Sequence, residues 1–235
     1  MSPLAVEDLG TIVGVWAHPD DETYLSAGIM AQAIRNGQRV VCVTATKGEA
    51  GSQDEERWPT ATLAAVREAE LMTALGALGV TEHHWLGYPD GGCDGVDDTE
   101  AIEKIGSVLR AAAADTVLTF GPDGQTGHPD HIAVCRWTTA AAARVDGTAL
   151  YYATVTPEWW EGRGKALDAF DVWFAGYPAI TPRDELAIDH HLSDEQLTLK
   201  FRAIEAQVSQ SAGLIAALGK DAFLAGIGEE TYRLP

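Results

Sequence analysis

The sequence predicts an α/β fold in which a mainly parallel sheet is covered by helices on both faces. Short apolar runs rich in β-branched residues alternate with longer stretches that carry apolar residues at helical spacing. The apolar runs lack polar alternation, which is typical of strands buried on both faces. Strands and helices that alternate at this rhythm favour a parallel sheet.

The expected elements follow one another along the first two thirds of the chain. Strands are predicted at residues 11–17, 39–44, 84–86 (the weakest), 115–120 and 149–155, and helices at 22–36, 62–78, 99–113 and 129–144. Gly37 and Gly79 stand where the first two helices should end. After residue 155 the pattern blurs, and a further helix is predicted at 193–209. Because we find no internal repeat or linker, we expect a single domain over residues 1–235.

The charge balance limits the partners. The chain has 35 acidic and 16 basic residues, a formal net charge of −19, which disfavours nucleic acid and anionic membrane surfaces. The first residues lack the features of a secretory signal and no apolar run has the length of a membrane span, so we expect a cytoplasmic protein. Cys42, Cys93 and Cys135 are odd in number and far apart, and we expect reduced thiols.

Two polar segments fall where the predicted strands end. His18-Pro19-Asp20-Asp21-Glu22 follows the first strand, and His128-Pro129-Asp130-His131 follows the glycine-rich stretch 121–127 behind another strand. In folds of this class ligands bind beyond the carboxyl ends of the strands. A catalytic zinc-type site uses three ligands drawn from His and carboxylate and keeps a position for water. The sequence therefore predicts a metal-dependent hydrolase with its metal between the two segments.

Helix capping is the competing explanation for both segments. A single His-Pro or Asp-Asp at a helix start is usually only a cap. Two His/Asp clusters at strand ends of one sheet are hard to produce by capping alone, so we favour the site. The residues alone leave open which aspartate binds the metal and which holds the water.

Five segments carry a family resemblance, and they occur in the family order: Ala17-His18-Pro19-Asp20-Asp21-Glu22, Thr46-Lys47-Gly48-Glu49, Arg67-Glu68-Ala69-Glu70-Leu71, Leu86-Gly87-Tyr88-Pro89-Asp90-Gly91 and Gly127-His128-Pro129-Asp130-His131. They resemble the LmbE-like, or PIG-L-type, metal-dependent N-deacetylases from about residue 11 to 140, whereas the last 80 residues match only loosely. The resemblance implies a Rossmann-like fold. It also implies removal of an acetyl group from a GlcNAc-type amino sugar, which gives acetate and a free amine.

The resemblance also implies a role for individual residues. His18, Asp21 and His131 correspond to the metal ligands, usually for zinc, and Asp20 to the general base. His128 corresponds to the histidine that stabilises the oxyanion and assists the leaving amine, Asp130 to the carboxylate that orients it, and Arg67 to an arginine that contacts the sugar or its phosphate.

Several points stay open at this stage. Glu49 and Asp90 are candidates for substrate contact, although turn formation explains loop acids equally well. Two histidines and a carboxylate serve Zn²⁺ and Fe²⁺ alike, and a homo-oligomer is compatible with the sequence. The alternatives are an amidase acting on a larger thiol or sugar conjugate and a non-catalytic metal-binding protein. A nucleotide-binding module is disfavoured because no glycine-rich phosphate motif follows the first strand.

Overall fold

A computed structural model describes residues 2–170 and 172–235. Within these residues the strands form one sheet with the order β3-β2-β1-β4-β5-β7-β6. Strands β1 to β5 pair in parallel, and β7 pairs antiparallel with both β5 and β6. The strands are β1 (Ile12–Trp16), β2 (Val40–Thr44), β3 (Glu82–Trp85), β4 (Thr116–Thr119), β5 (Ala149–Thr154), β6 (Ile188–His191) and β7 (Glu229–Arg233).

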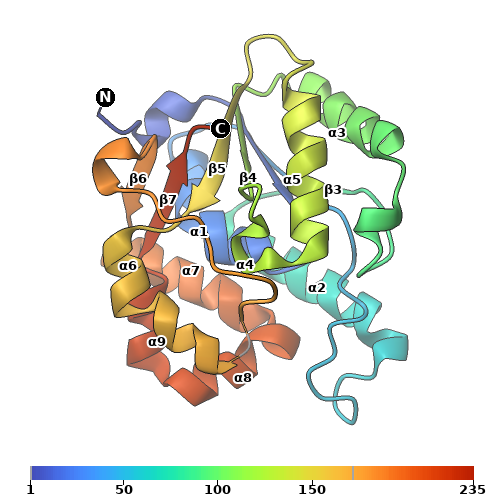
Figure 1. Cartoon of the computed structure of the whole chain (residues 1–235), viewed down its shortest axis with the longest axis vertical. Helices are drawn as coiled ribbons and strands as arrows, with labels where there is room; N and C mark the ends of the chain where they lie inside the picture. Colours follow the sequence, from blue (N-terminus) through green and yellow to red (C-terminus); the bar gives the residue numbers. More distant parts are fainter. Residues whose placement is uncertain (1, 171) are drawn as a thin grey trace.

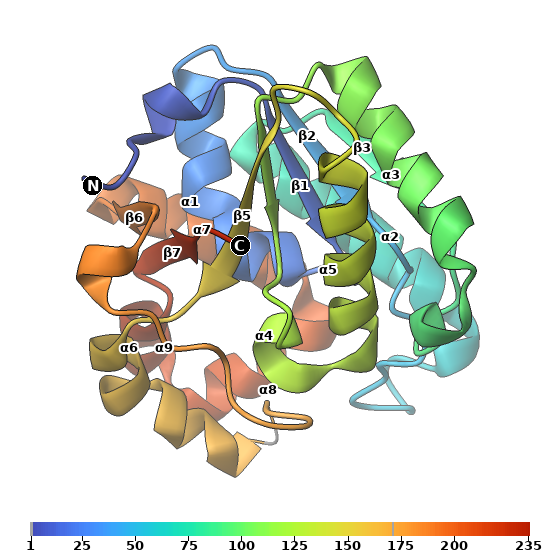
Figure 2. The same ribbon diagram turned by 45° about the horizontal axis from the view of Figure 1, so that its top comes forward.

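Helices cover both faces of this sheet. They are α1 (Asp21–Arg35), α2 (Thr60–Leu78), α3 (Asp98–Ala112), α4 (Gly124–Gly127), α5 (Pro129–Ala142), α6 (Pro157–Gly162), α7 (Asp194–Ala206), α8 (Val208–Leu218) and α9 (Lys220–Gly226). Helices α3 and α5 pack together on one face, and α1, α2 and α7 pack together on the other (Figures 1 and 2). The mainly parallel sheet with helices on both faces is therefore confirmed.

The predicted elements of the first 155 residues are confirmed to within a few residues. Gly37 and Gly79 follow α1 and α2 with φ of 79° and 80°, the left-handed conformation that ends helices. The single helix predicted at 193–209 is wrong, because Gln207 (φ −96°, ψ 52°) separates α7 from α8. The strands β6 and β7 were not predicted, since both are short and rich in polar residues.

The central strands run through the main hydrophobic core. Every residue of β1, β2 and β4 is buried, as the continuous apolar runs predicted. Behind the ends of β1 and β4, the rings of Trp16 and Phe120 meet edge to face with centroids 5.3 Å apart. The loops that leave these two strands therefore start from a rigid base.

The C-terminal segment is tied into the middle of α1 by a buried ion pair. Nζ of Lys200 lies 2.9 Å from Glu230, and both side chains are fully buried. The Glu230 carboxylate accepts the N–H groups of Gly28 and Ile29 at 2.8 Å, and Lys200 donates to the carbonyl of Tyr24 at 2.7 Å. In a regular helix these backbone groups bond one another at i and i+4 spacing. Residues of α7 and β7 thus bond the backbone in the middle of the helix that begins at the polar segment 18–22.

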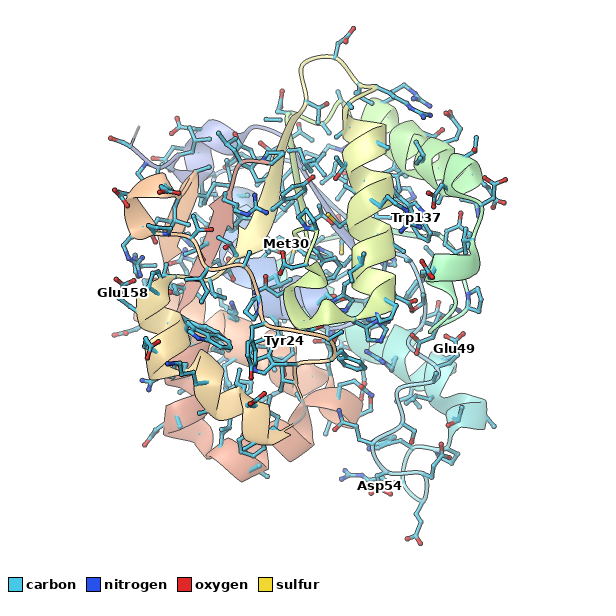
Figure 3. The ribbon with its side chains drawn as sticks, in the orientation of Figure 1. Tyr24, Met30, Glu49, Asp54, Trp137 and Glu158 are labelled. Carbon is cyan, nitrogen blue, oxygen red and sulfur yellow. The ribbon has the colours of Figure 1, made fainter. Side chains whose placement is uncertain are left out.

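Other features bear on the remaining expectations. Among the described residues, no helix is both long enough and apolar enough to cross a membrane. Cys42, Cys93 and Cys135 are buried and free, as expected. The acidic run at 54–56 is exposed, and Asp54 lies on the loop that projects between β2 and α2 (Figure 3).

Candidate active site

The two polar segments meet where the sheet changes its winding direction. β1 is central, and its neighbours β2 and β4 are reached by helices on opposite faces. The loops behind β1 and β4 therefore diverge and leave a crevice, which is the usual ligand site of such sheets. The segment 18–21 enters this crevice from β1, and α4 with the first turn of α5 enters it from β4 (Figure 2).

Three side chains bring their ligand atoms together in the crevice. Nδ1 of His18 lies 3.1 Å from Nε2 of His131, and Asp21 places its carboxylate oxygens 3.7 Å from the former and 3.4 Å from the latter. Metal–ligand bonds of about 2.0–2.1 Å in tetrahedral geometry separate the ligand atoms by about 3.3 Å. The separation of the two nitrogens is close to that requirement, and each of them has a different carboxylate oxygen of Asp21 at a similar distance.

The opposite nitrogen of each ring fixes its orientation. Nε2 of His18 lies 3.0 Å from Asp90 and 3.3 Å from Asp130, and Nδ1 of His131 lies 2.9 Å from the carbonyl of Gly124. A proton on each of these nitrogens leaves the lone pairs of the other two nitrogens facing each other beside a carboxylate. Only a cation between them stabilises this arrangement, and such outer hydrogen bonds are typical of metal-binding histidines.

The protonation of the two histidines differs. Burial lowers the pKa of His131 well below its usual value, and the neighbouring His18 charge lowers it further, so this imidazole is neutral. Burial also lowers the pKa of His18, but hydrogen bonds to Asp130 and Asp90 and the charge of Asp21 outweigh it and raise the pKa to about 10. A cation that bound between the two rings would therefore have to displace the proton of His18.

Asp20, which directly precedes Asp21, has an unusual backbone conformation. Its φ of 116° is rare for a residue with a side chain, and its carboxylate makes no hydrogen bond to the N-terminus of α1, although it occupies the capping position. The carboxylate lies 3.4 Å from the Arg67 guanidinium instead. Burial raises the pKa of Asp20 to about 7, against the lowering effect of the Arg67 charge.

His128 caps helix α5 with its own ring. Nδ1 accepts the backbone N–H of Asp130 at 3.1 Å, so the ring proton of the neutral imidazole belongs to Nε2. His128, His18 and His131 each offer a nitrogen, and these three nitrogens lie within 4.8 Å of one another. His128 is therefore close enough to act on a group bound at the cluster, and its free N–H can donate there.

The carboxylate of Asp130 differs from the expectation that it orients His128. It is fully buried and accepts the backbone N–H groups of Gly91 and Cys93 at 2.8 and 3.1 Å, and it contacts His18. Its link to His128 is through the backbone. The physical reason is that the loop 91–93 offers two N–H groups to the second residue of α5, while His128 bonds the helix N-terminus itself.

The expected substrate-contacting residues lie close to the cluster but bond mainly to protein. Asp90 contacts His18 and accepts the backbone N–H of Ala50 at 2.8 Å, and Glu49 accepts that of Asp90 at 3.0 Å, so the two acids tie their loops together. Figure 3 shows Glu49 on the loop between β2 and α2.

Arg67 is only 4% exposed. It donates to the carbonyl of Gly48 at 2.9 Å and to that of Pro19 at 2.5 Å. Its two terminal nitrogens are therefore engaged by the loops that carry Asp20 and Glu49, whereas its buried Nε has no hydrogen-bond partner among the described residues.

Phe174 was missed by the sequence analysis. Its ring centroid lies 4.6 Å from that of His128, in an edge-to-face arrangement, and its backbone N–H bonds the carbonyl of Thr126 at 2.7 Å. Yet 64% of this apolar residue is exposed. No sequence motif marks Phe174, because it lies in an irregular segment, 46 residues after His128. Folding of the chain brings it to the site.

The sequence is similar to one protein family and to several named deacetylases. Residues 13–142 match the family model described as PIG-L, GlcNAc-PI de-N-acetylase. A 1D-myo-inositol 2-acetamido-2-deoxy-alpha-D-glucopyranoside deacetylase of Mycobacterium sp. (strain KMS) is 33% identical over 99% of this chain and 86% of that protein. The protein of the same name from Corynebacterium diphtheriae is 29% identical over 92% of this chain and 83% of that protein.

Solved structures share the fold at lower identity. N,N'-diacetylchitobiose deacetylase from Pyrococcus horikoshii has a TM-score of 0.69 at 21% identity, over 97% of this chain and 85% of that one. GalB, the 4-carboxy-2-hydroxymuconate hydratase of Pseudomonas putida KT2440, has a TM-score of 0.63 at 14% identity, over 95% of both chains. One fold thus hosts a deacetylase and a hydratase, so the activity has to be argued from the site.

Proposed function

Because the chain belongs to the PIG-L family of GlcNAc-PI de-N-acetylases, we propose that it is a metal-dependent hydrolase that removes the acetyl group from an N-acetylated amino sugar of the GlcNAc type. The products are acetate and the free amine. The observation that carries the proposal is the cluster of His18, Asp21 and His131, in which the two facing nitrogens are 3.1 Å apart and each has an oxygen of Asp21 within 3.7 Å.

We propose these three side chains as the metal ligands. Two imidazoles and one carboxylate suit Zn²⁺ and also Fe²⁺, and Zn²⁺ is our choice because it is the ion that such three-ligand hydrolytic sites generally use. A cation held there would lower the pKa of a bound water and would polarise the amide carbonyl. Asp90, Asp130 and the Gly124 carbonyl hold the two rings in place through their outer nitrogens.

Asp20 is proposed as the general base. Its positive φ turns the carboxylate away from the helix N-terminus that an aspartate at this position normally caps, which leaves the oxygen that Arg67 does not contact available to accept a proton from water. The raised pKa of about 7 lies in the range in which a carboxylate both holds and releases a proton near neutral pH. Arg67 contacts this carboxylate and so takes part in its orientation.

His128 is proposed as the group that donates to the developing oxyanion and then to the leaving amine. Its Nδ1 accepts a backbone N–H, so its proton is on Nε2, the nitrogen that is left for the substrate. A fixed donor of this kind needs no reorganisation as charge develops in the transition state. Asp130 supports His18 by its carboxylate and His128 by its backbone N–H.

The proposed substrate is a small N-acetylated sugar, in agreement with a formal net charge of −19, which repels nucleic acid and anionic lipid. We also propose a cytoplasmic location and Glu49 and Asp90 as loop residues that shape the substrate side of the site. The alternative is an amidase that cleaves a larger thiol or sugar conjugate at the same cluster.

The test measures amine release from a panel of N-acetylglucosaminides and from larger amide conjugates, with the bound metal determined by elemental analysis of the same preparation. We expect release from at least one N-acetyl amino sugar, and loss of that activity in metal-stripped protein. Cleavage of the larger amides alone would favour the amidase. A bound metal without any amide hydrolysis would favour the non-catalytic metal-binding protein.

A further inference from the structure

The backbone of Asp20 has an unusual conformation for the first residue before a helix. An aspartate at a helix N-terminus normally has extended φ and accepts the N–H groups of the first turn. Asp20 has φ 116° and ψ −32° and makes no such bond. A conformation of this kind persists only where the surroundings over-determine it.

A buried carboxylate holds the Asp20 peptide from one side. The backbone N–H of Asp20 donates to Oε2 of Glu22 at 3.0 Å, and Glu22 is fully buried. The other oxygen of Glu22, Oε1, accepts a hydrogen bond from Nε2 of Gln207 at 2.8 Å. Gln207 is 1% exposed. The three groups form a continuous chain of hydrogen bonds in a region without solvent.

Gln207 is itself fixed at both ends of its amide. Oε1 lies 2.8 Å from the hydroxyl of Thr23, while Nε2 faces Glu22, so the amide has one favourable orientation. It projects from the break between α7 and α8. That break is anchored separately by Glu70 of α2, which accepts the backbone N–H of Ser209 at 2.9 Å and its hydroxyl at 2.6 Å.

We propose that Gln207 is a positioning residue for Asp20, which it holds in the strained conformation through Glu22. The inference rests on the proposed function, in which Asp20 is the general base. Without the Gln207 donor, one oxygen of Glu22 is buried and unsatisfied, and a shift of the carboxylate toward another donor withdraws it from the Asp20 N–H. Asp20 is then free to take the ordinary capping conformation, which turns its carboxylate away from the cluster.

The assignment gives the C-terminal third of the chain a part in catalysis. Gln207 lies outside the segment 13–142 that matches the family model. The break between α7 and α8 is what allows a residue of this region to reach the first turn of α1.

The experiment compares Gln207→Leu with Ser209→Ala. Both remove a buried hydrogen bond at the same helix break, but only Gln207 is connected to Asp20. We expect Gln207→Leu to lower kcat by about 10- to 100-fold, since a small displacement of a reacting group costs that much. KM and bound metal should stay within about twofold, and Ser209→Ala should keep its kcat. Equal effects of the two variants on kcat would overturn the proposal.

A double-variant cycle separates positioning from general destabilisation. If Gln207 acts through Asp20, Gln207→Leu should cause no further loss of residual activity in an Asp20→Asn background. Additive losses would overturn the assignment. If Gln207→Leu does not fold, Gln207→Met keeps the side-chain length and removes the donor, with the same expectations.

Hydrogen exchange of the Asp20 amide, followed by NMR, is independent of activity. Exchange should become faster in Gln207→Leu and stay unchanged in Ser209→Ala. Unchanged exchange in both variants would overturn the proposal that Gln207 holds Asp20 through Glu22. A wild-type protein without any deacetylase activity would instead overturn the proposed function. The exchange result would still show whether Gln207 holds Asp20 through Glu22.

Discussion

Nδ1 of His18 lies 3.1 Å from Nε2 of His131, although the two residues are 113 positions apart in the sequence. The other nitrogen of each ring faces an oxygen acceptor. The two nitrogens that face each other lie beside the Asp21 carboxylate, so a positive charge between them stabilises all three groups. A proton on His18 or a metal ion supplies that charge. The chemistry of the site therefore depends on which of the two is bound.

Metal affinity should rise with pH. The pKa of His18 is raised to about 10 in the metal-free protein, so at neutral pH the ring is protonated and the incoming ion displaces that proton. Displacement of one proton strengthens apparent binding by about tenfold per pH unit below that pKa. Titrations with Zn²⁺ at pH 6, 7 and 8 in the presence of a competing chelator measure the slope. A pH-independent affinity would mean that His18 is not a ligand.

His128→Ala should retain the metal and lose kcat by about 10²- to 10³-fold, the usual cost of removing one transition-state donor. His128 holds its proton on Nε2, the nitrogen left for the substrate. Elemental analysis and steady-state kinetics of the same preparation distinguish the possible roles. Loss of the metal would identify His128 as a ligand, in keeping with its nitrogen within 4.8 Å of those of His18 and His131.

Arg67→Ala should lower both stability and kcat. The guanidinium is buried and bonds the carbonyls of Pro19 and Gly48, and hydrogen bonds to a charged group contribute about 1.5–3 kcal/mol each. Urea unfolding and kinetics measure the two effects. A raised KM with unchanged stability would show instead that Arg67 acts by binding the sugar.

Glu230→Gln should reduce the free energy of unfolding by about 3–5 kcal/mol, because it leaves the fully buried Lys200 without its counter-charge. The matched control is Glu82→Gln, which breaks an exposed ion pair with Arg39 and should leave the unfolding transition unchanged. Similar effects of the two substitutions would mean that the Lys200–Glu230 pair does not hold α7 and β7 on α1.

The parallel half of the fold could be predicted because its signals are local. The apolar runs that form β1, β2 and β4 are buried on both faces, and glycines with positive φ follow α1 and α2. β6 and β7 could not be predicted because they are short, polar strands whose pairing depends on contacts across the sheet. The helix break at Gln207 could not be predicted for a similar reason, since residues of α1 and α2 hold it in place.

The site could be predicted as two segments but not as a network. The strand ends indicated that His18 and His131 would meet, and they do. The expected role of the Asp130 carboxylate differed, because backbone N–H groups of a distant loop bind it beside His18. Phe174 could not be predicted at all. Such links depend on which loops lie side by side, and spacing along the sequence carries no information about that.

The measurement that tests the central claim most directly is bound metal per chain together with kcat for Asp20→Asn and Asp21→Asn at saturating metal. An amide oxygen is a poorer ligand than a carboxylate, so Asp21→Asn should weaken metal retention. Asp20→Asn should keep the metal and lose about 10²- to 10⁴-fold in kcat, because the amide cannot accept the proton of the water. Loss of metal by Asp20→Asn and retention by Asp21→Asn would reverse the two roles, and metal retention with near-normal turnover in both would contradict the proposed site.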